Sequence, residues 1–287
     1  MIETRLALEG EIQRQKELWK LCFGDEQSYI DHYYTHLYRP EQTAVLVADG
    51  VIASMLTMLP VSLLLPQGGK LDAAMIYAVA TDPVYQGHGY GSKLMQFAHN
   101  HLAGQGKALS VLVPASQSLF GFYGNRGYFP AFSLCEAAAG AAKGDEAVVA
   151  PASPQEYEHR RDALLKGRLH IGYTRQGIAY QQSLCKATGA DLYAIDLQEA
   201  RGCAAVERLS PQKVLVKELL LPGHLMGKGL AALARQLPAQ RYMVRAPGWR
   251  QGGLGGQVRP FAMARWYDKS YSSVFSGPNG YLALAYD

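Results

Sequence analysis

The stretch that decides the fold is Val79-Ala80-Thr81-Asp82-Pro83-Val84-Tyr85-Gln86-Gly87-His88-Gly89-Tyr90-Gly91-Ser92, where an apolar run meets three closely spaced glycines. Residues 71–81, which lead into the glycines, are rich in β-forming types and predict a strand. The residues that follow predict an amphipathic helix, because one face recurs at helical spacing: Leu94, Phe97, Ala98, His101 and Leu102. A strand therefore enters a glycine-rich turn and leaves it as a helix.

This turn has the chemistry of an anion site. Glycine lets the backbone turn sharply and lets a ligand approach it closely. The free amides at the start of the helix, with the positive end of the helix dipole behind them, stabilise a negative charge by roughly 0.3–1 kcal/mol at exposed sites. The turn predicts a pyrophosphate-binding site, although an ordinary tight turn has the same short pattern and stays open as an alternative.

Other nucleotide-binding motifs fit the sequence less well. The chain has no G-x-x-x-x-G-K-[ST] motif. The residues before the turn predict an antiparallel meander, with strands over 43–48 and 51–59 joined by the hairpin signal Asp49-Gly50, and a further turn at Pro66–Lys70. A meander disfavours the P-loop and dinucleotide-binding folds, which are built on parallel βαβ units.

The remaining elements of the first half are two helices and a strand. Large apolar side chains recur at helical spacing over Glu11–Phe23 and around Ile30–Leu37. Leu109–Val113 predicts a buried strand. Two helices, three antiparallel strands, a helix and a strand make an α+β domain.

The second half repeats this order. Ala137–Pro154 is rich in Ala, Gly and Pro and predicts a linker or a long surface loop. A capping box at Ser153–Glu156 opens a helix toward Leu165. Three strands, a helix and a strand follow, over 190–197, 202–209, 213–221, 230–237 and 242–244. We therefore expect a duplication, with domains at 1–140 and 141–287.

Composition narrows the class of protein. The chain has 287 residues, 48% hydrophobic and 18% charged, which is enough to bury a substantial core. Residues 1–140 carry 9 Lys/Arg against 12 Asp/Glu, and residues 141–287 carry 19 against 12. The basic residues of the second half are not clustered, which favours a solvated surface over a nucleic-acid site.

The N-terminus has no secretory pattern, and no run of about 18 apolar residues occurs. The four scattered cysteines lack zinc-like spacing, so we expect reduced thiols, no metal and a cytoplasmic protein.

A second motif lies downstream of the strand at 109–113. Pro114-Ala115-Ser116 is followed by Phe122-Tyr123-Gly124-Asn125-Arg126-Gly127-Tyr128. With Gln86-Gly87-His88-Gly89-Tyr90-Gly91, this pair of motifs resembles the GCN5-related N-acetyltransferase (GNAT) superfamily, whose signatures are [RQ]-x-x-G-x-[GA] and F-Y-x-x-x-G-[FY]. The resemblance covers about residues 11–132. It implies a mixed, mostly antiparallel central sheet flanked by helices. Gln86 departs from the commoner Arg, and a guanidinium contact to phosphate is lost.

The resemblance also implies roles for individual residues. Acetyl-CoA would be the co-substrate. Its pantetheine amides would pair with the backbone of Val79, Ala80 and Thr81, and its pyrophosphate would lie on the loop and first helical turn: Gln86, Gly87, His88, Gly89, Tyr90, Gly91 and Ser92. Ser116 or Ser118 would contact the pantetheine arm. An amide of the 79–81 strand would stabilise the oxyanion, and Tyr123 would be the general acid. The alternative for Tyr123 is a packing role.

No general base is assigned. Asp82 and His88 lie in the cofactor loop, where such residues are usually turn formers. The second helix carries Tyr33, Tyr34 and His36, whose spacing is equally well explained by packing. In the enhanced-intracellular-survival acetyltransferases, which the whole chain resembles, the free C-terminal carboxylate acts as the base. The resemblance would assign this role to Asp287.

The chain as a whole resembles the first two domains of the enhanced-intracellular-survival acetyltransferases, in which a degenerate GNAT-like domain follows a catalytic one. Its second half keeps glycines in His224-Leu225-Met226-Gly227-Lys228-Gly229, either as a relic of the cofactor loop or as an unrelated turn. Nothing like Phe122-Tyr123 follows it. The alternation in Tyr281–Asp287 predicts a paired strand at the end.

The sequence therefore predicts an acetyl-CoA-dependent N-acetyltransferase that moves an acetyl group to a primary amine by direct attack. The acceptor would be a small molecule or a peptide, with no nucleic acid or membrane partner, and a homo-oligomer is left open. One alternative is a non-catalytic acyl-CoA-binding or regulatory module. A second is a tRNA-dependent aminoacyl transferase, with the basic second half as the RNA surface.

Overall fold

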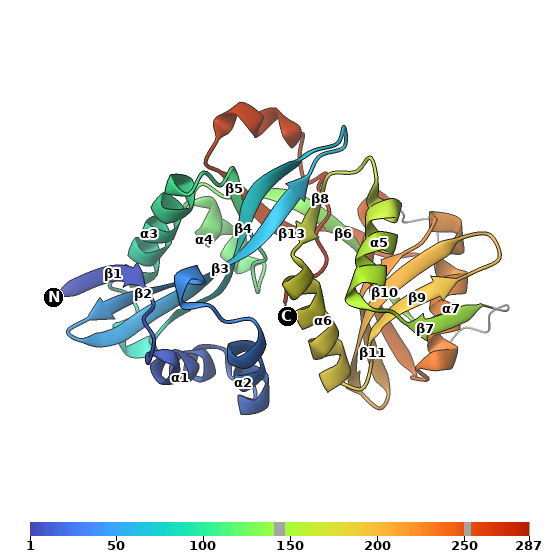
Figure 1. Ribbon diagram of the computed structural model, residues 1–287, viewed down its shortest axis with the longest axis horizontal. Helices are drawn as coiled ribbons and strands as arrows, with labels where there is room; N and C mark the ends of the chain where they lie inside the picture. The colour runs from blue at the N-terminus through green and yellow to red at the C-terminus, as the bar shows by residue number, and fades with distance from the viewer. Residues whose placement is uncertain (141–146, 250–253, 287) are drawn as a thin grey trace. The chain divides into compact units, whose positions relative to one another are not determined.

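The computed structural model describes residues 1–140, 147–249 and 254–286, and it has the predicted α+β class (Figure 1). The chain forms two compact units. The first comprises Met1–Leu63, Lys70–Phe129 and Met263–Val274, and the second comprises Leu64–Gly69, Pro130–Ala262 and Phe275–Asp287. The domain boundary between 140 and 141 stays a prediction, and residue 141 lies outside the described residues.

The first unit is a mostly antiparallel sheet with helices on both faces (Figure 1). Its strands are β1 (Ile2–Leu6), β2 (Thr43–Ala48), β3 (Val51–Leu64), β4 (Lys70–Thr81) and β5 (Leu109–Leu112), and its helices are α1 (Ile12–Phe23), α2 (Gln27–His36), α3 (Tyr90–Gly104) and α4 (Ser118–Gly124). The strands lie side by side in chain order. One apolar cluster packs α3 on the sheet, with Leu46, Leu56, Ile76, Leu94 and Leu112 among its members.

The hairpin between β2 and β3 forms where Asp49-Gly50 predicted it. Asp49 has φ 49° and Gly50 has φ 83°, and a two-residue hairpin turn of this kind needs both values positive. The returning strand β3 therefore continues the antiparallel register with β2.

Strands β4 and β5 are parallel and stay together only briefly. Their register consists of Ala73 with Leu109, Ala74 with Ser110 and Met75 with Val111. Strand β4 continues to Thr81, whereas β5 ends at Leu112. The two strands therefore diverge toward their carboxyl ends.

The second unit repeats the order of the first. Helices α5 (Pro154–Leu165) and α6 (Arg175–Ala187) precede the antiparallel strands β9 (Leu192–Asp196), β10 (Arg201–Ser210) and β11 (Lys213–Leu220), and helix α7 (Met226–Gln236) leads to β12 (Arg241–Pro247). Strand β12 is parallel to β11, as β5 is to β4. Strands β7 (Val148–Pro151) and β8 (His170–Tyr173) are additional. Ser153 caps α5 as predicted, accepting from the Glu156 amide at 3.1 Å, but the Glu156 carboxylate pairs with Arg160 at 2.9 Å rather than completing a capping box.

Each unit is completed by a strand from the other half of the sequence. Strand β6 (Phe129–Ala139) follows α4 but pairs antiparallel with β12. Strand β13 (Gln257–Trp266) follows β12, yet its residues Met263–Trp266 pair antiparallel with β5. Sequence patterns did not predict this exchange.

Three local predictions need correction. The proposed linker Ala137–Pro154 is partly sheet, because β6 extends to Ala139 and β7 occupies Val148–Pro151, while 141–146 lie outside the described residues. The paired strand predicted at Tyr281–Asp287 does not form over 282–286. These residues are apolar because they are buried, and Asp287 lies outside the described residues. Finally, α7 begins at Met226, which places Gly229 inside a helix rather than in a loop.

Two further features bear on the class of protein. Each of the four cysteines is a free thiol, as predicted. Among the described residues, no helix is long and apolar enough to cross a membrane.

The core of the second unit depends on two glycines that flank Leu221. A Cβ at Gly202 would lie 2.5 Å from Leu221 Cδ2 and 2.7 Å from the Leu220 carbonyl oxygen, and one at Gly229 would lie 2.1 Å from Leu221 Cδ1. Leu221 is fully buried within the apolar core cluster of this unit. We predict that Gly202→Ala lowers the free energy of unfolding by about 1–3 kcal/mol. Urea denaturation measures this, with Gly140→Ala as the control, because nothing lies within 4 Å of a Cβ there. Equal stabilities for the two variants would contradict the close packing.

Candidate active site

The loop between β4 and α3 presents free backbone amides. Gly87 has φ 81° and Gly89 has φ 75°, values that residues with a side chain rarely adopt. Gly89 is the N-cap of α3, and no side chain caps the amides of the first turn. These amides, with the helix dipole behind them, are therefore available to an anion.

Polar contacts within the loop hold its shape. Asp82 accepts from the Val84 amide at 3.1 Å and forms an ion pair with Arg14 at 2.6 Å. The Gln86 amide group donates to the Thr81 carbonyl oxygen at 3.2 Å, and His88 Nδ1 lies 3.0 Å from the Gln86 carbonyl oxygen. Asp82 and His88 thus act as turn formers, which was one of the two interpretations of the sequence.

The end of β4 is fixed from β3. The Ser54 hydroxyl donates to the Ala80 carbonyl oxygen at 2.7 Å and lies 2.8 Å from Thr81 Oγ1. Gly91 packs closely here, since a Cβ would lie 3.4 Å from Thr81 Oγ1. Val79 is half-buried in the apolar cluster beneath α3. The predicted cofactor residues of β4 and of the loop therefore form one continuous segment.

Helix α4 brings Tyr123 to the same cluster. Tyr123 is buried, and its ring packs edge-on against Phe122 and Tyr128, at 5.1 Å and 6.0 Å between centroids. Burial raises the pKa of its phenol, while the charge of Arg126 lowers it. No described residue makes a hydrogen bond to the hydroxyl. The phenol is therefore protonated at neutral pH and has a proton to donate.

Ser116 and Ser118 lie at the start of α4. Their hydroxyl oxygens are 2.8 Å apart and exposed. Since Ser116 follows β5, both serines stand near the end of the strand that diverges from β4. Whether either touches a cofactor stays a prediction.

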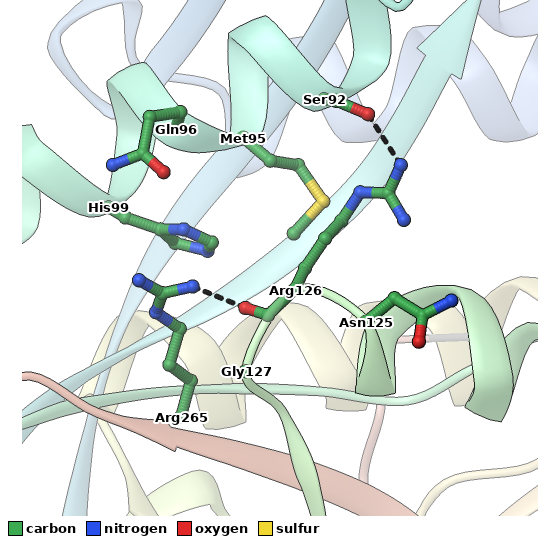
Figure 2. Close-up of a pocket in the computed structure, with 8 residues that line it drawn as sticks. All are labelled: Ser92, Met95, Gln96, His99, Asn125, Arg126, Gly127 and Arg265. Carbon is green, nitrogen blue, oxygen red and sulfur yellow. Dashed lines mark hydrogen bonds between the residues drawn. The ribbon is translucent and has the colours of Figure 1, made fainter.

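A pocket of about 620 Å³ lies beside the first turn of α3 (Figure 2). Helix α3 and the turn after α4 contribute most of its lining, and β13 contributes one residue: Ser92, Met95, Gln96, His99, Asn125, Arg126, Gly127 and Arg265. Arg126 donates to the Ser92 hydroxyl, and Arg265 donates to the Arg126 carbonyl oxygen. Arg126 thus places a guanidinium beside the cofactor loop. In that loop, Gln86 occupies the motif position at which arginine is commoner.

A buried polar chain ends in this pocket. Tyr267 donates to the Ser110 hydroxyl at 2.8 Å, Ser110 and Tyr128 hydroxyls are 2.7 Å apart, and the Tyr128 hydroxyl lies 3.1 Å from His99 Nε2. Burial, followed by the charge of Arg265, lowers the pKa of His99 to about 4. The imidazole is therefore neutral at physiological pH.

The aromatic residues of α2 make packing contacts with neighbouring side chains. The Tyr33 hydroxyl donates to Thr57 at 3.1 Å, and its ring lies 4.8 Å from that of Trp19. Tyr34 donates to Gln15 at 3.4 Å. His36 stacks on His32 at 4.1 Å. These contacts favour the packing interpretation, and none of the three identifies a base.

Sequence patterns missed three residues of this site. Arg126 occupies a variable position within the motif at 122–128, and its neighbours gave no hint of a ligand. His99 lies on the buried face of an amphipathic helix, where packing is the usual role. Arg265 comes from a strand that was not predicted, far along the chain from Ser92. A tertiary structure was needed to bring them together.

A mixed sheet whose parallel strands diverge before an uncapped helix start has the architecture of a GNAT domain. Residues 3–131 match the family model of the acetyltransferase (GNAT) domain, so this part of the chain belongs to the GNAT superfamily. No curated protein matches the chain.

Solved structures share the fold over both units. A probable N-acyltransferase from Enterococcus faecalis V583 has 18% identity and a TM-score of 0.69, covering 94% of this chain and 74% of that one. Eis1 from Mycobacterium abscessus has 13% identity and a TM-score of 0.66, with coverage of 93% and 74%. A GCN5-related N-acetyltransferase from Anabaena variabilis has 18% identity and a TM-score of 0.71, with coverage of 93% and 73%. The predicted tandem fold is thereby confirmed.

The low pKa of His99 predicts a pH effect on stability. Between pH 6.5 and 4 the unfolded chain binds a proton at this position that the folded chain does not, so stability falls as the pH falls. The full difference amounts to about 3 kcal/mol. We predict that the free energy of unfolding of His99→Gln falls less steeply with decreasing pH than that of the wild type, as measured by urea denaturation at pH 7, 5.5 and 4. Identical pH slopes for wild type and variant would contradict a buried neutral imidazole.

Proposed function

We propose that the protein is an acetyl-CoA-dependent N-acetyltransferase that acetylates a primary amine by direct attack. The observation that carries the proposal is the uncapped start of α3 behind Gly87 and Gly89, placed where β4 and β5 diverge. Membership of residues 3–131 in the GNAT superfamily supports the same reaction class.

The residues present fit acetyl-CoA. The amides from Gly87 to Ser92 suit a pyrophosphate, because the loop offers backbone donors with no side chain in front of them. The backbone of Val79, Ala80 and Thr81 continues past the last β5 partner and suits the pantetheine amides. Acetyl-CoA would supply a thioester whose carbonyl carbon is open to a nucleophile.

In this reaction the protein positions the two substrates, stabilises the oxyanion and donates one proton. The amine nitrogen forms a bond to the carbonyl carbon, and the bond from that carbon to sulfur breaks. A backbone amide of 79–81 stabilises the negative charge on the carbonyl oxygen. Tyr123 donates its phenolic proton to the departing thiolate, whose basicity is close to that of a phenol. The amine gives up its own proton to a base that we do not assign.

The acceptor belongs to the same proposal. A small molecule or a peptide with a primary amine fits the reaction, with no nucleic acid or membrane partner. A cytoplasmic location agrees with four free thiols. A panel of polyamines, amino acids, aminoglycosides and peptides, assayed for amine-dependent release of CoA thiol, tests the function, and failure of every amine to accelerate release over hydrolysis would favour a non-catalytic CoA-binding module.

Tyr123→Phe separates acid catalysis from packing. We predict that kcat falls by about 10²–10⁴-fold while acetyl-CoA affinity and melting temperature stay nearly unchanged, because the ring remains and the proton is lost. Single-turnover kinetics make the comparison independent of product release. Tyr242→Phe is the control, since it removes a buried hydroxyl in the second unit that bonds the Leu237 carbonyl oxygen. A kcat within a few-fold of wild type for Tyr123→Phe would remove the acid role.

Gly89→Asp tests the anion site. We predict that it weakens acetyl-CoA binding by at least about 100-fold, because a carboxylate would face the phosphates where a bare amide is needed. Gly106→Asp is the matched control: its φ of 72° imposes a similar backbone cost, and it lies beyond the other end of α3. Calorimetry that gave equal affinities for these two variants would exclude the loop as the phosphate site.

A further inference from the structure

The pocket beside α3 carries uncompensated positive charge. Arg126 and Arg265 both line it, and no carboxylate stands among its lining residues. The Nε atoms of both guanidiniums are buried without a hydrogen-bond partner in the described part of the chain. Both side chains are only partly buried, and their other contacts are to neutral oxygens, so an anion that joined them would gain charge-assisted hydrogen bonds.

The existing contacts of the two arginines use main-chain carbonyl oxygens rather than acids. Arg126 Nη1 donates to the Phe122 carbonyl oxygen at 2.6 Å, and its guanidinium stacks 3.5 Å above the Phe122 ring. Arg265 donates to the carbonyl oxygen of Arg126. Gly127 permits this approach, because a Cβ there would lie 3.2 Å from Arg265 Nη1. The guanidiniums are thus held in place while their charge remains available.

His99 adds a neutral donor. The side chain is 3% exposed and its Nδ1 has no partner in the part of the chain that the structure describes. Figure 2 shows its ring facing the guanidinium of Arg265. Since Tyr267 donates to Ser110, the hydroxyl protons can run in one direction through Ser110 and Tyr128 to His99 Nε2. Nδ1 then carries the ring proton and is a donor.

Two guanidiniums and one N–H donor suit an anion with several oxygens and more than one charge, which is the chemistry of a phosphate monoester. The pocket also shares Ser92 with the first turn of α3, where the proposed function places the pyrophosphate. A phosphate monoester joined to that pyrophosphate through a ribose is the 3′-phosphate of CoA.

We propose that this pocket binds the 3′-phosphate of CoA through Arg126, Arg265 and His99, and that it selects CoA over its 3′-dephospho form. The proposal rests on the proposed function. Arg265 lies outside residues 3–131, so the family-model region alone does not contain this selectivity. Strand β13 supplies it from the far part of the chain.

Calorimetry with CoA and 3′-dephospho-CoA tests the pocket on the unmodified protein. We expect CoA to bind about 10- to 100-fold more tightly, since the ligands differ by one phosphate and charge-assisted hydrogen bonds hold it. Equal affinities would overturn this proposal and leave the proposed function standing. Binding of neither ligand would overturn both.

Arg265→Gln then assigns the preference to residues. Its ratio of the two dissociation constants should fall toward one, with the affinity for 3′-dephospho-CoA unchanged. His99→Gln should reduce the ratio in part. Arg259→Gln is the control, because Arg259 pairs with Glu136 at 2.5 Å away from the pocket and should keep the wild-type ratio. A wild-type ratio in Arg265→Gln would overturn the assignment.

Discussion

The parallel pairing of β4 and β5 is the constraint on which the first unit depends. Parallel neighbours cannot be joined by a tight hairpin, so the chain must leave the sheet, form α3 and return. This crossover places the start of α3 at the carboxyl end of β4, where the glycines expose its amides. The pairing ends after Met75 and Val111, and the separation that follows gives the end of β4 a free edge.

Local physics made much of the fold predictable. Asp49-Gly50 specified a turn that few other dipeptides adopt, and the spacing of Leu94, Ala98 and Leu102 specified the buried face of α3. Long-range pairing was not predictable in this way. The alanines at 137–139 looked like a linker because alanine is uncommon in strands, yet they pair with β12, a partner about a hundred residues away in the sequence.

The same distinction between local patterns and long-range contacts applies to the candidate site. The cofactor loop and Tyr123 belong to contiguous motifs, and the sequence was enough to propose them. The polar chain from Tyr267 to His99 joins residues of β5, α3 and the segment after β13, so no single stretch contained its pattern. In the second unit, Leu221 fills the space beside Gly229, which lies within the first turn of α7, so the glycines there do not make an open cradle.

The exchange of strands also governs the order in which the protein can be completed during synthesis. The first unit lacks Met263–Val274 until these residues have been synthesised, which at about 5–20 residues per second is a delay on the order of ten seconds after Phe129. During that interval the edge of β5 has no β13 to pair with, and an unpaired edge strand is prone to wrong partners. Nascent chains arrested before residue 263 should therefore depend on chaperones more than the finished protein does.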